Sequence, residues 1–157
     1  MSEKEKFMLE AIDLSFQAMR TGSGGPFGAI IVKNGKIIAR GMNKVTANND
    51  PTAHAEIVAI RNACEHLQTF QLTGCEVYTS CEPCPMCLGA IYWARPDKIY
   101  FANTKKDAAE AGFDDQFIYE ELNLNLPDRK FTCEQLCRQD ALKAFEEWKT
   151  KTNKVHY

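Results

Sequence analysis

Residues 81–88 of this chain read Cys81-Glu82-Pro83-Cys84-Pro85-Met86-Cys87-Leu88. Pro85 stands where a helix can begin, at a position whose missing N–H costs the helix nothing. Cys84 and Cys87 are then three residues apart on one face of the first helical turn. The positive end of the helix dipole favours the thiolate form of both side chains, which is the form that binds metals.

A second polar stretch lies about thirty residues upstream and reads Thr52-Ala53-His54-Ala55-Glu56. Residues i and i+2 face nearly opposite sides of a regular helix, so His54 and Glu56 converge only beyond the helix's N-terminal end. Pro51 as a breaker and Thr52 as N-cap supply that end. The sequence therefore predicts two helix N-termini that point at one metal ion.

One imidazole and two thiolates form a ligand set that suits zinc. The three protein ligands His54, Cys84 and Cys87 leave the fourth tetrahedral position to water, which is typical of a catalytic site with one zinc ion per subunit. Zinc lowers the pKa of such a water toward neutrality. Glu56 is not needed as a ligand, so we expect it to take a proton from the water and pass it to the substrate.

The cysteine pattern also allows two other interpretations. Cys81/Cys84 and Cys84/Cys87 overlap as Cys-x-x-Cys pairs, which a redox centre or a closed zinc knot would use. A redox motif does not need His-x-Glu at a second helix start, and a closed knot normally uses a second ligand pair at knuckle spacing. We assign the other cysteines to packing or to semi-buried positions: Cys64, Cys75, Cys81, Cys133 and Cys137.

Length and composition indicate one ordinary globular domain over residues 1–157, since 45% of the residues are hydrophobic and 25% are charged. The N-terminus is polar, and no apolar run is long enough for a membrane span, so we expect a cytoplasmic protein. Seven cysteines, an odd number, disfavour a disulfide framework.

The charge balance disfavours a polyanionic partner. The chain carries 19 Lys and Arg residues against 21 Asp and Glu residues, and its net charge is −2. Proteins that grip a nucleic acid usually carry a surplus of basic residues. A small uncharged substrate is therefore expected, with neither nucleic acid nor membrane as a partner.

The apolar periodicity predicts an α/β fold with three layers. Residues 4–20 form an amphipathic helix, and the glycine-rich residues 22–26 form a turn, because a phosphate loop would follow a strand and precede a helix. Two apolar runs flank Asn34-Gly35, the strongest short hairpin signal. A central mixed sheet that opens with this hairpin, with helices on both faces, follows from the alternation of the expected elements: strands 29–33, 36–40, 75–80 and 98–101, and helices 53–67 and 85–94.

The last third of the chain has a weaker pattern. Residues 104–122 tend to be helical but are broken at Gly112. Residues 122–128 are expected to form a loop, and residues 131–136 an edge strand or an irregular connection. A helix over 141–149 and a polar tail over 150–157 complete the chain.

His-x-Glu followed by Pro-Cys-x-x-Cys is the signature of zinc-dependent nucleobase deaminases, and on these residues the chain resembles the cytidine-deaminase-like superfamily. Further segments are similar to small bacterial guanine deaminases: residues 25–29, 48–56, 78–94 and 111–115, with Tyr157 at the C-terminus. The resemblance implies a sheet between helix layers and a hydrolase that acts on the C–N bond of a cyclic amidine, converting guanine to xanthine and ammonia.

The zinc motif alone does not choose the substrate. It is compatible with cytosine, cytidine, tRNA adenosine or guanine, so a deaminase of a nucleoside or of another aminopurine or triazine base stays an alternative. A nucleic-acid-editing deaminase and a non-catalytic zinc module are two further interpretations. Balanced charge disfavours the former, and the intact Glu56 with an open coordination position disfavours the latter.

The resemblance also implies roles around the pocket. Glu56 is the main proton shuttle, and Asp114 is a second acid near the leaving amine. Asn43 hydrogen-bonds a ring nitrogen or carbonyl, and the tail over 150–157 closes the pocket, often from the partner subunit of a homodimer. The implied substrate-binding residues, which include two aromatic walls, are Phe27, Asn43, Ala55, Trp93 and Tyr157.

Each of these residues also has a purely structural interpretation. Asn43 is suited to capping a strand end, and Phe27 and Trp93 to the core. Asp114 is suited to starting a helix, and Tyr157 stands where chain ends usually fray.

Overall fold

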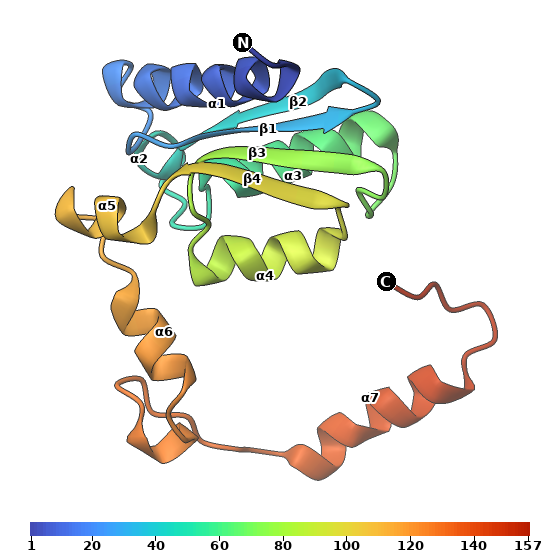
Figure 1. Cartoon of the computed structure of the whole chain (residues 1–157). Helices are drawn as coiled ribbons and strands as arrows, with labels where there is room; N and C mark the ends of the chain where they lie inside the picture. Colours follow the sequence, from blue (N-terminus) through green and yellow to red (C-terminus); the bar gives the residue numbers. More distant parts are fainter. The chain divides into compact units, whose positions relative to one another are not determined.

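The computed structural model describes residues 1–157, which divide into two compact units, Met1–Gln116 and Phe117–Tyr157. Unit 1 contains the sheet and both metal motifs (Figure 1). The prediction of one domain over residues 1–157 stays a prediction.

The sheet of unit 1 has four strands in the order β2-β1-β3-β4. β1 pairs antiparallel with β2 and with β3, and β3 pairs parallel with β4, so the sheet is mixed, as predicted. Asn34 and Gly35 both have positive φ values (50° and 70°), as the predicted hairpin turn requires. The strands are β1 (Gly28–Lys33), β2 (Lys36–Met42), β3 (Cys75–Cys81) and β4 (Lys98–Asn103).

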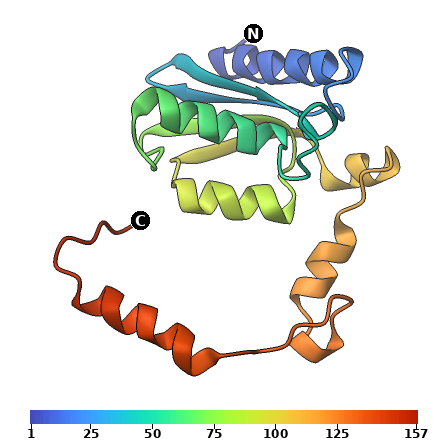
Figure 2. The same ribbon diagram turned by 180° about the vertical axis from the view of Figure 1, so that it is seen from behind.

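Helices cover both faces of this sheet. α1 (Glu3–Arg20) lies on one face, and α3 (Ala55–Leu67) and α4 (Pro85–Ala94) lie on the other (Figures 1 and 2). Alternate residues of the central strands supply the two cores: Ile30 packs with α1, and Ile31 packs with α3 and α4. The predicted three-layer α/β/α arrangement is confirmed.

Close packing of α3 against β2 positions the N-terminal end of α3. A Cβ atom at Gly41 in β2 would collide with the backbone oxygen of Ala55 and the backbone of Ala59. Only glycine therefore allows the first turn of α3 to lie so near the strand. This turn carries one of the two metal motifs.

Two short helices complete unit 1. α2 (Val45–Asn48), which the sequence analysis did not identify, ends at Asn49 in the left-handed conformation. α5 (Lys105–Glu110) follows β4, and its N-cap Thr104 forms a capping box with Asp107. Gly112 has a φ value of +92°, which explains the predicted break before α6 (Gln116–Leu122).

Unit 2 consists of helical segments joined by irregular chain. The predicted loop at 122–128 contains a 3-10 turn, η1 (Leu126–Asp128), and residues 131–136 form an irregular connection without strand pairing. α7 (Arg138–Thr150) starts three residues earlier than expected. Unit 2 buries none of its side chains. In the whole chain, no helix has the length and apolar character needed to span a membrane.

Candidate metal centre and active site

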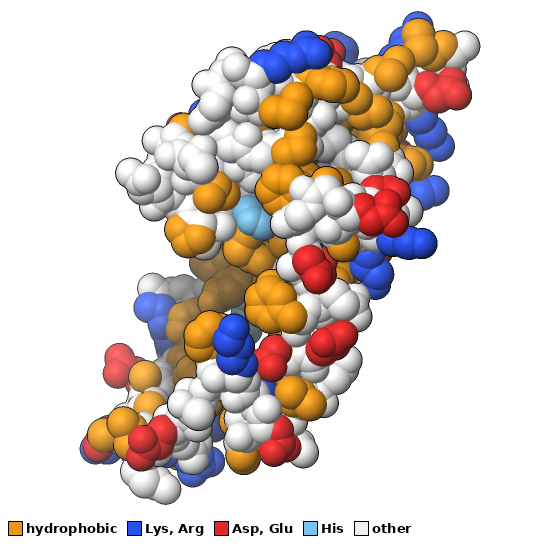
Figure 3. All heavy atoms as spheres, turned by 90° about the vertical axis from the view of Figure 1, so that its left-hand side faces the viewer, with side chains coloured by type: hydrophobic (Ala, Val, Ile, Leu, Met, Phe, Trp, Pro, Cys, Tyr) orange, Lys and Arg blue, Asp and Glu red, His pale blue; other side chains and the backbone are white.

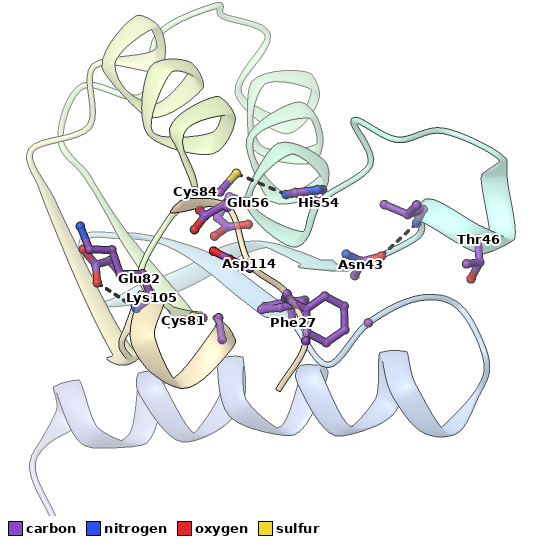
Figure 4. Close-up of a pocket in the computed structure, with 16 residues that line it drawn as sticks. Phe27, Asn43, Thr46, His54, Glu56, Cys81, Glu82, Cys84, Lys105 and Asp114 are labelled. Carbon is purple, nitrogen blue, oxygen red and sulfur yellow. Dashed lines mark hydrogen bonds between the residues drawn. The ribbon is translucent and has the colours of Figure 1, made fainter. Parts of the chain in front are cut away.

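Both metal motifs lie at helix N-caps. His54 is the N-cap of α3 and Cys84 is the N-cap of α4, and both have extended backbone conformations (φ −67°, ψ 156° and φ −66°, ψ 169°). The two helix N-termini meet at one place, as predicted (Figure 4). The predicted N-cap Thr52 is wrong, because its N–H and hydroxyl both bind Oδ1 of Asp50 (2.8 and 2.7 Å) in the turn before the helix.

The three predicted ligands have the spacing of a metal site. Nδ1 of His54 lies 3.5 Å from Sγ of Cys84 and 3.5 Å from Sγ of Cys87. Two ligands bound at about 2.0–2.3 Å to a tetrahedral zinc ion are themselves roughly 3.5 Å apart. All three ligand atoms lie within 4.8 Å of one another. The donor set and its spacing therefore fit zinc.

The electrostatics of the two thiols also favour a cation. A hydrogen bond from Cys87 lowers the pKa of the Cys84 thiol to about 4, so Cys84 is a thiolate at neutral pH. The same contact with Cys84, reinforced by burial, raises the pKa of the Cys87 thiol. The hydrogen bond with Cys84 also raises the pKa of His54. A bound cation supplies the positive charge that allows both sulfurs to be thiolates at once.

Glu56 lies in the first turn of α3, and only 5% of its surface is exposed. Its Oε1 accepts a hydrogen bond from the Thr79 hydroxyl (3.0 Å), and its Oε2 lies 3.4 Å from Sγ of Cys87. Burial raises the pKa of this carboxyl group above its ordinary value. Glu56 is therefore a carboxyl group beside the metal ligands whose environment suits proton transfer.

His54, Glu56 and Cys84 line a pocket of about 400 Å³ in unit 1, a volume within the usual range for small-molecule sites. Hydrophobic side chains surround a pale blue histidine on the face shown in Figure 3. Five predicted site residues line the pocket together with Cys84 (Figure 4): Phe27, Asn43, His54, Glu56 and Asp114.

Asn43 has an amide whose orientation is fixed. Its Oδ1 accepts the N–H of Val45 (3.0 Å), and its backbone carbonyl accepts the hydroxyl of Ser23 (2.9 Å). Since the amide oxygen is used in this way, the amide NH₂ group is left as the donor for a ligand. A Cβ atom at Gly24 would overlap Oδ1 of Asn43, so glycine is required there for this orientation.

One side of the pocket is aromatic. The rings of Phe27 and Phe113 meet edge to face, with centroids 5.0 Å apart and an interplanar angle of 86°. Both side chains line the pocket. The sequence analysis did not identify Phe113, although this residue lies within the segment 111–115 that carries the resemblance.

The two adjacent aspartates of this segment have different surroundings. Asp114 is exposed, and its Oδ1 accepts the N–H of Gln116 (2.8 Å) at the start of α6. Asp115 is half-buried and also lines the pocket. Burial and then the charge of Cys84 raise the pKa of Asp115. Asp115, which sequence reasoning missed, is thus a second candidate for the role predicted for Asp114.

Two predicted substrate-binding residues of unit 1 do not line this pocket. Ala55 is fully buried at the start of α3, and Trp93 on α4 is 63% exposed. Tyr157 belongs to unit 2. Their predicted contacts with substrate stay predictions.

The pocket rim carries charges that the sequence analysis did not assign to the site. Oε2 of Glu82 accepts the N–H of Lys105 (3.0 Å), which joins the end of β3 to the start of α5 (Figure 4). Both residues line the pocket. Glu82 lies inside the Cys81–Leu88 motif, but no spacing rule singles it out, and nothing in the sequence links it to Lys105.

Known deaminases match this chain in sequence and in structure. The family model of the cytidine and deoxycytidylate deaminase zinc-binding region matches residues 1–103. A guanine deaminase from Bacillus subtilis (strain 168) is 52% identical over 153 residues, which are 98% of each chain. The X-ray structure of guanine deaminase from Bacillus subtilis has a TM-score of 0.95 with this chain and covers 98% of both.

Two further relatives match about two thirds of the chain. A tRNA-specific adenosine deaminase from Aquifex aeolicus is 45% identical over 103 residues, which are 66% of this chain and 68% of that protein. A guanine deaminase structure from Nitrosomonas europaea has 34% identity and a TM-score of 0.66, and the match covers 69% of this chain and 63% of that one. With its paired helix N-termini and its His54, Cys84 and Cys87 ligand set, the chain belongs to the cytidine and deoxycytidylate deaminase family of zinc-binding proteins.

Proposed function

We propose that this chain is a zinc-dependent guanine deaminase, a hydrolase that converts guanine and water to xanthine and ammonia. The observation that carries the proposal is the pocket, whose wall contains the metal ligands His54 and Cys84 and the buried carboxyl group of Glu56. The third ligand, Cys87, lies behind this wall with its Sγ 3.5 Å from Nδ1 of His54. Likeness to the Bacillus subtilis guanine deaminase along almost the whole chain supports guanine as the base.

The ligands His54, Cys84 and Cys87 would hold the zinc ion. When bound, zinc would act as a Lewis acid and lower the pKa of the attacking water. Glu56 accepts a proton of the attacking water and delivers it to a ring nitrogen, and it then moves the proton of the new hydroxyl group at C2 to the departing amine. A C–O bond forms at C2 of the purine, the C2–N bond breaks, and ammonia leaves.

The rest of the pocket would orient the flat base. The amide NH₂ of Asn43 donates a hydrogen bond to an acceptor on the purine, such as its carbonyl oxygen. The rings of Phe27 and Phe113 provide an apolar wall. Asp114 or Asp115 acts as the second acid near the leaving amine, and the structure supports Asp115 as the more deeply placed of the two.

The charges around the pocket support a neutral base over a phosphorylated substrate. Three carboxyl groups besides Glu56 line it, namely Glu82, Asp114 and Asp115, against one lysine, Lys105. A phosphate group near these carboxylates would be repelled, so a nucleotide or a tRNA strand is a poor match.

A panel of substrates tests the proposal. Zinc-loaded protein is incubated with guanine, guanosine, adenine, cytosine and cytidine, and ammonia is measured. We expect release from guanine with a matching amount of xanthine. Ammonia from cytosine or adenine but not from guanine would refute the substrate assignment and leave the zinc chemistry intact, and release only from guanosine would move the activity to the nucleoside.

We further propose a homodimer in which the C-terminal segment of one subunit completes the pocket of its partner. Each unit exposes large apolar side chains: Tyr92 (74%) and Phe101 (49%) in unit 1, and Phe131 (74%) and Phe145 (68%) in unit 2. Unit 2 buries none of its side chains, so its helices lack a core of their own. Association of two chains would cover these surfaces, and Tyr157 would then reach the substrate. A cytoplasmic location is part of the proposal, because the site needs reduced thiols.

A further inference from the structure

Thr79 is a buried β3 residue whose hydroxyl contacts Glu56 without belonging to the metal ligand set. Only 1% of its surface is exposed. Its Oγ1 lies 3.0 Å from Oε1 of Glu56 and 3.1 Å from the backbone oxygen of Cys81. Thr79 shares its face of β3 with Val77, which packs with α3 and α4, so its side chain meets the first turn of α3.

The two carboxyl oxygens of Glu56 have different neighbours. Oε1 accepts the hydrogen bond from Thr79, and Oε2 lies beside Sγ of Cys87, one of the metal ligands. A carboxyl group that transfers protons must present the same oxygen to the reacting atoms at each turnover. Without the contact to Oε1, the carboxyl group of Glu56 is free to rotate about its terminal bond.

We propose that Thr79 is a positioning residue for Glu56, whose hydroxyl holds Oε1 so that Oε2 faces the metal ligands. This inference rests on the proposed deaminase function, in which Glu56 is the proton shuttle. Thr79 itself touches neither the substrate nor the metal.

The hydroxyl of Thr79 suits both forms that a proton shuttle adopts. A hydroxyl group has one hydrogen and two lone pairs. When Glu56 is a carboxylate, Thr79 donates its hydrogen to Oε1. When Oε2 of Glu56 carries the proton, Oε1 is still an acceptor, so the same hydrogen bond from Thr79 holds the carboxyl group in place. Valine has nearly the same shape but no hydroxyl to donate to Oε1, whereas serine keeps this donor.

The test compares Thr79→Val and Thr79→Ser with a matched control, Ser80→Ala. Ser80 is the next residue of β3, is also buried (2% exposed), and its Oγ accepts the N–H of Gly28 (3.0 Å) on the opposite face of the strand. For each protein, kcat and KM for guanine, bound zinc and Tm are measured. Loss of a hydrogen bond to a charged group predicts a fall of about ten- to hundredfold in kcat for Thr79→Val, with KM and zinc content unchanged.

Two results complete the expected pattern. Thr79→Ser restores most of kcat, and Ser80→Ala lowers Tm but keeps kcat. An unchanged kcat in Thr79→Val would overturn the inference, as would an equal loss of kcat in Ser80→Ala, because that would indicate general damage to β3. If Thr79→Val does not fold, the same comparison of kcat, KM, bound zinc and Tm is made with Thr79→Ala.

Failure of the proposed function gives a different result. If zinc-loaded wild-type protein releases ammonia from another base but not from guanine, the guanine assignment fails, and the kinetics of the Thr79 variants are measured with that base. Zinc-loaded wild-type protein that deaminates none of the bases would overturn both proposals.

Discussion

Nδ1 of His54 and Sγ of Cys84 lie 3.5 Å apart, although 30 positions separate the two residues in the sequence. Each is the N-cap of its helix, so the contact brings the positive ends of two helix dipoles to one point. The positive potential at this place favours negatively charged groups such as thiolates and a carboxylate. The same geometry places the carboxyl group of Glu56, two residues after His54 in the first turn of α3, beside the ligands.

Replacing Glu56 by glutamine should separate metal binding from turnover. Glu56→Gln leaves the three ligands intact, so bound zinc is unchanged, whereas the loss of the proton shuttle lowers kcat by at least about a hundredfold. Ammonia release and zinc content are measured on the same samples. Glu65→Gln, on the exposed side of the same helix, is the control and should behave as wild type. Wild-type kcat in Glu56→Gln would refute the shuttle role.

The adjacent aspartates can be told apart by a pair of variants. Asp115 is half-buried beside Cys84, whereas Asp114 is exposed and binds the N–H of Gln116. We therefore expect Asp115→Asn to lower kcat for guanine more than Asp114→Asn does, and Asp114→Asn to act mainly on Tm. Steady-state kinetics and thermal unfolding measure the two effects. The reverse order in kcat would restore Asp114 to the role predicted from the sequence.

Mixed dimers test the exchange of the C-terminal segment. One chain carries Glu56→Gln and keeps Tyr157, and the other keeps Glu56 and lacks residues 150–157. If the tail closes the pocket of the partner, each homodimer is inactive, but the mixed dimer has one pocket with an intact Glu56 and an intact tail. Co-expression should then recover part of the wild-type activity. Activity that stays at the level of the homodimers would show that each tail serves its own chain.

The stability of the protein should fall at alkaline pH because of Tyr78. Burial, with a hydrogen bond to Oε2 of Glu76 (2.9 Å), raises the pKa of this phenol well above its ordinary value. In the unfolded chain Tyr78 ionises near pH 10, whereas in the folded protein it keeps its proton, so unfolding releases a proton above that pH. The raised pKa of Tyr78 therefore leaves the free energy of unfolding unaffected below about pH 10. Above that pH it lowers the free energy of unfolding by up to about 1.4 kcal/mol per pH unit.

Chemical denaturation between pH 8 and pH 12 measures this dependence. Tyr78→Phe removes the phenolic hydroxyl group and keeps the ring that stacks on Tyr100. Its unfolding free energy should therefore fall less steeply with pH than that of the wild type. Parallel pH dependences in the two proteins would contradict the assignment to Tyr78.

The parts of the fold that the sequence predicted are those with local causes. The Asn34-Gly35 turn fixes the hairpin through backbone conformation alone. Pro85 fixes the start of α4, which the structure places at the expected residue. A geometric argument that holds for any i, i+2 pair placed the meeting point of His54 and Glu56 beyond the N-terminal end of a helix. In this motif the predicted N-cap, Thr52, was wrong, because the N-cap is His54.

The parts that were missed depend on contacts between distant residues. Nothing near Thr79 in the sequence indicates that its hydroxyl meets Glu56, because that contact comes from the packing of α3 on β3. Asp114 and Asp115 are adjacent and chemically identical, and only the path of the chain between α5 and α6 distinguishes their burial. Tyr157 lies in a unit that buries none of its side chains, so the residues near it in the sequence give no signal that tests its predicted contact with the substrate.

The most direct test of the account is the formation of xanthine from guanine by the same protein in three states: loaded with zinc, stripped with a chelator, and reloaded with zinc. We predict xanthine and ammonia in equal amounts from the loaded protein, none from the stripped protein, and recovery on reloading, with Cys84→Ala inactive in all three states. Xanthine formation that survives complete removal of zinc, or a fully zinc-loaded protein that leaves guanine unchanged, would contradict the account.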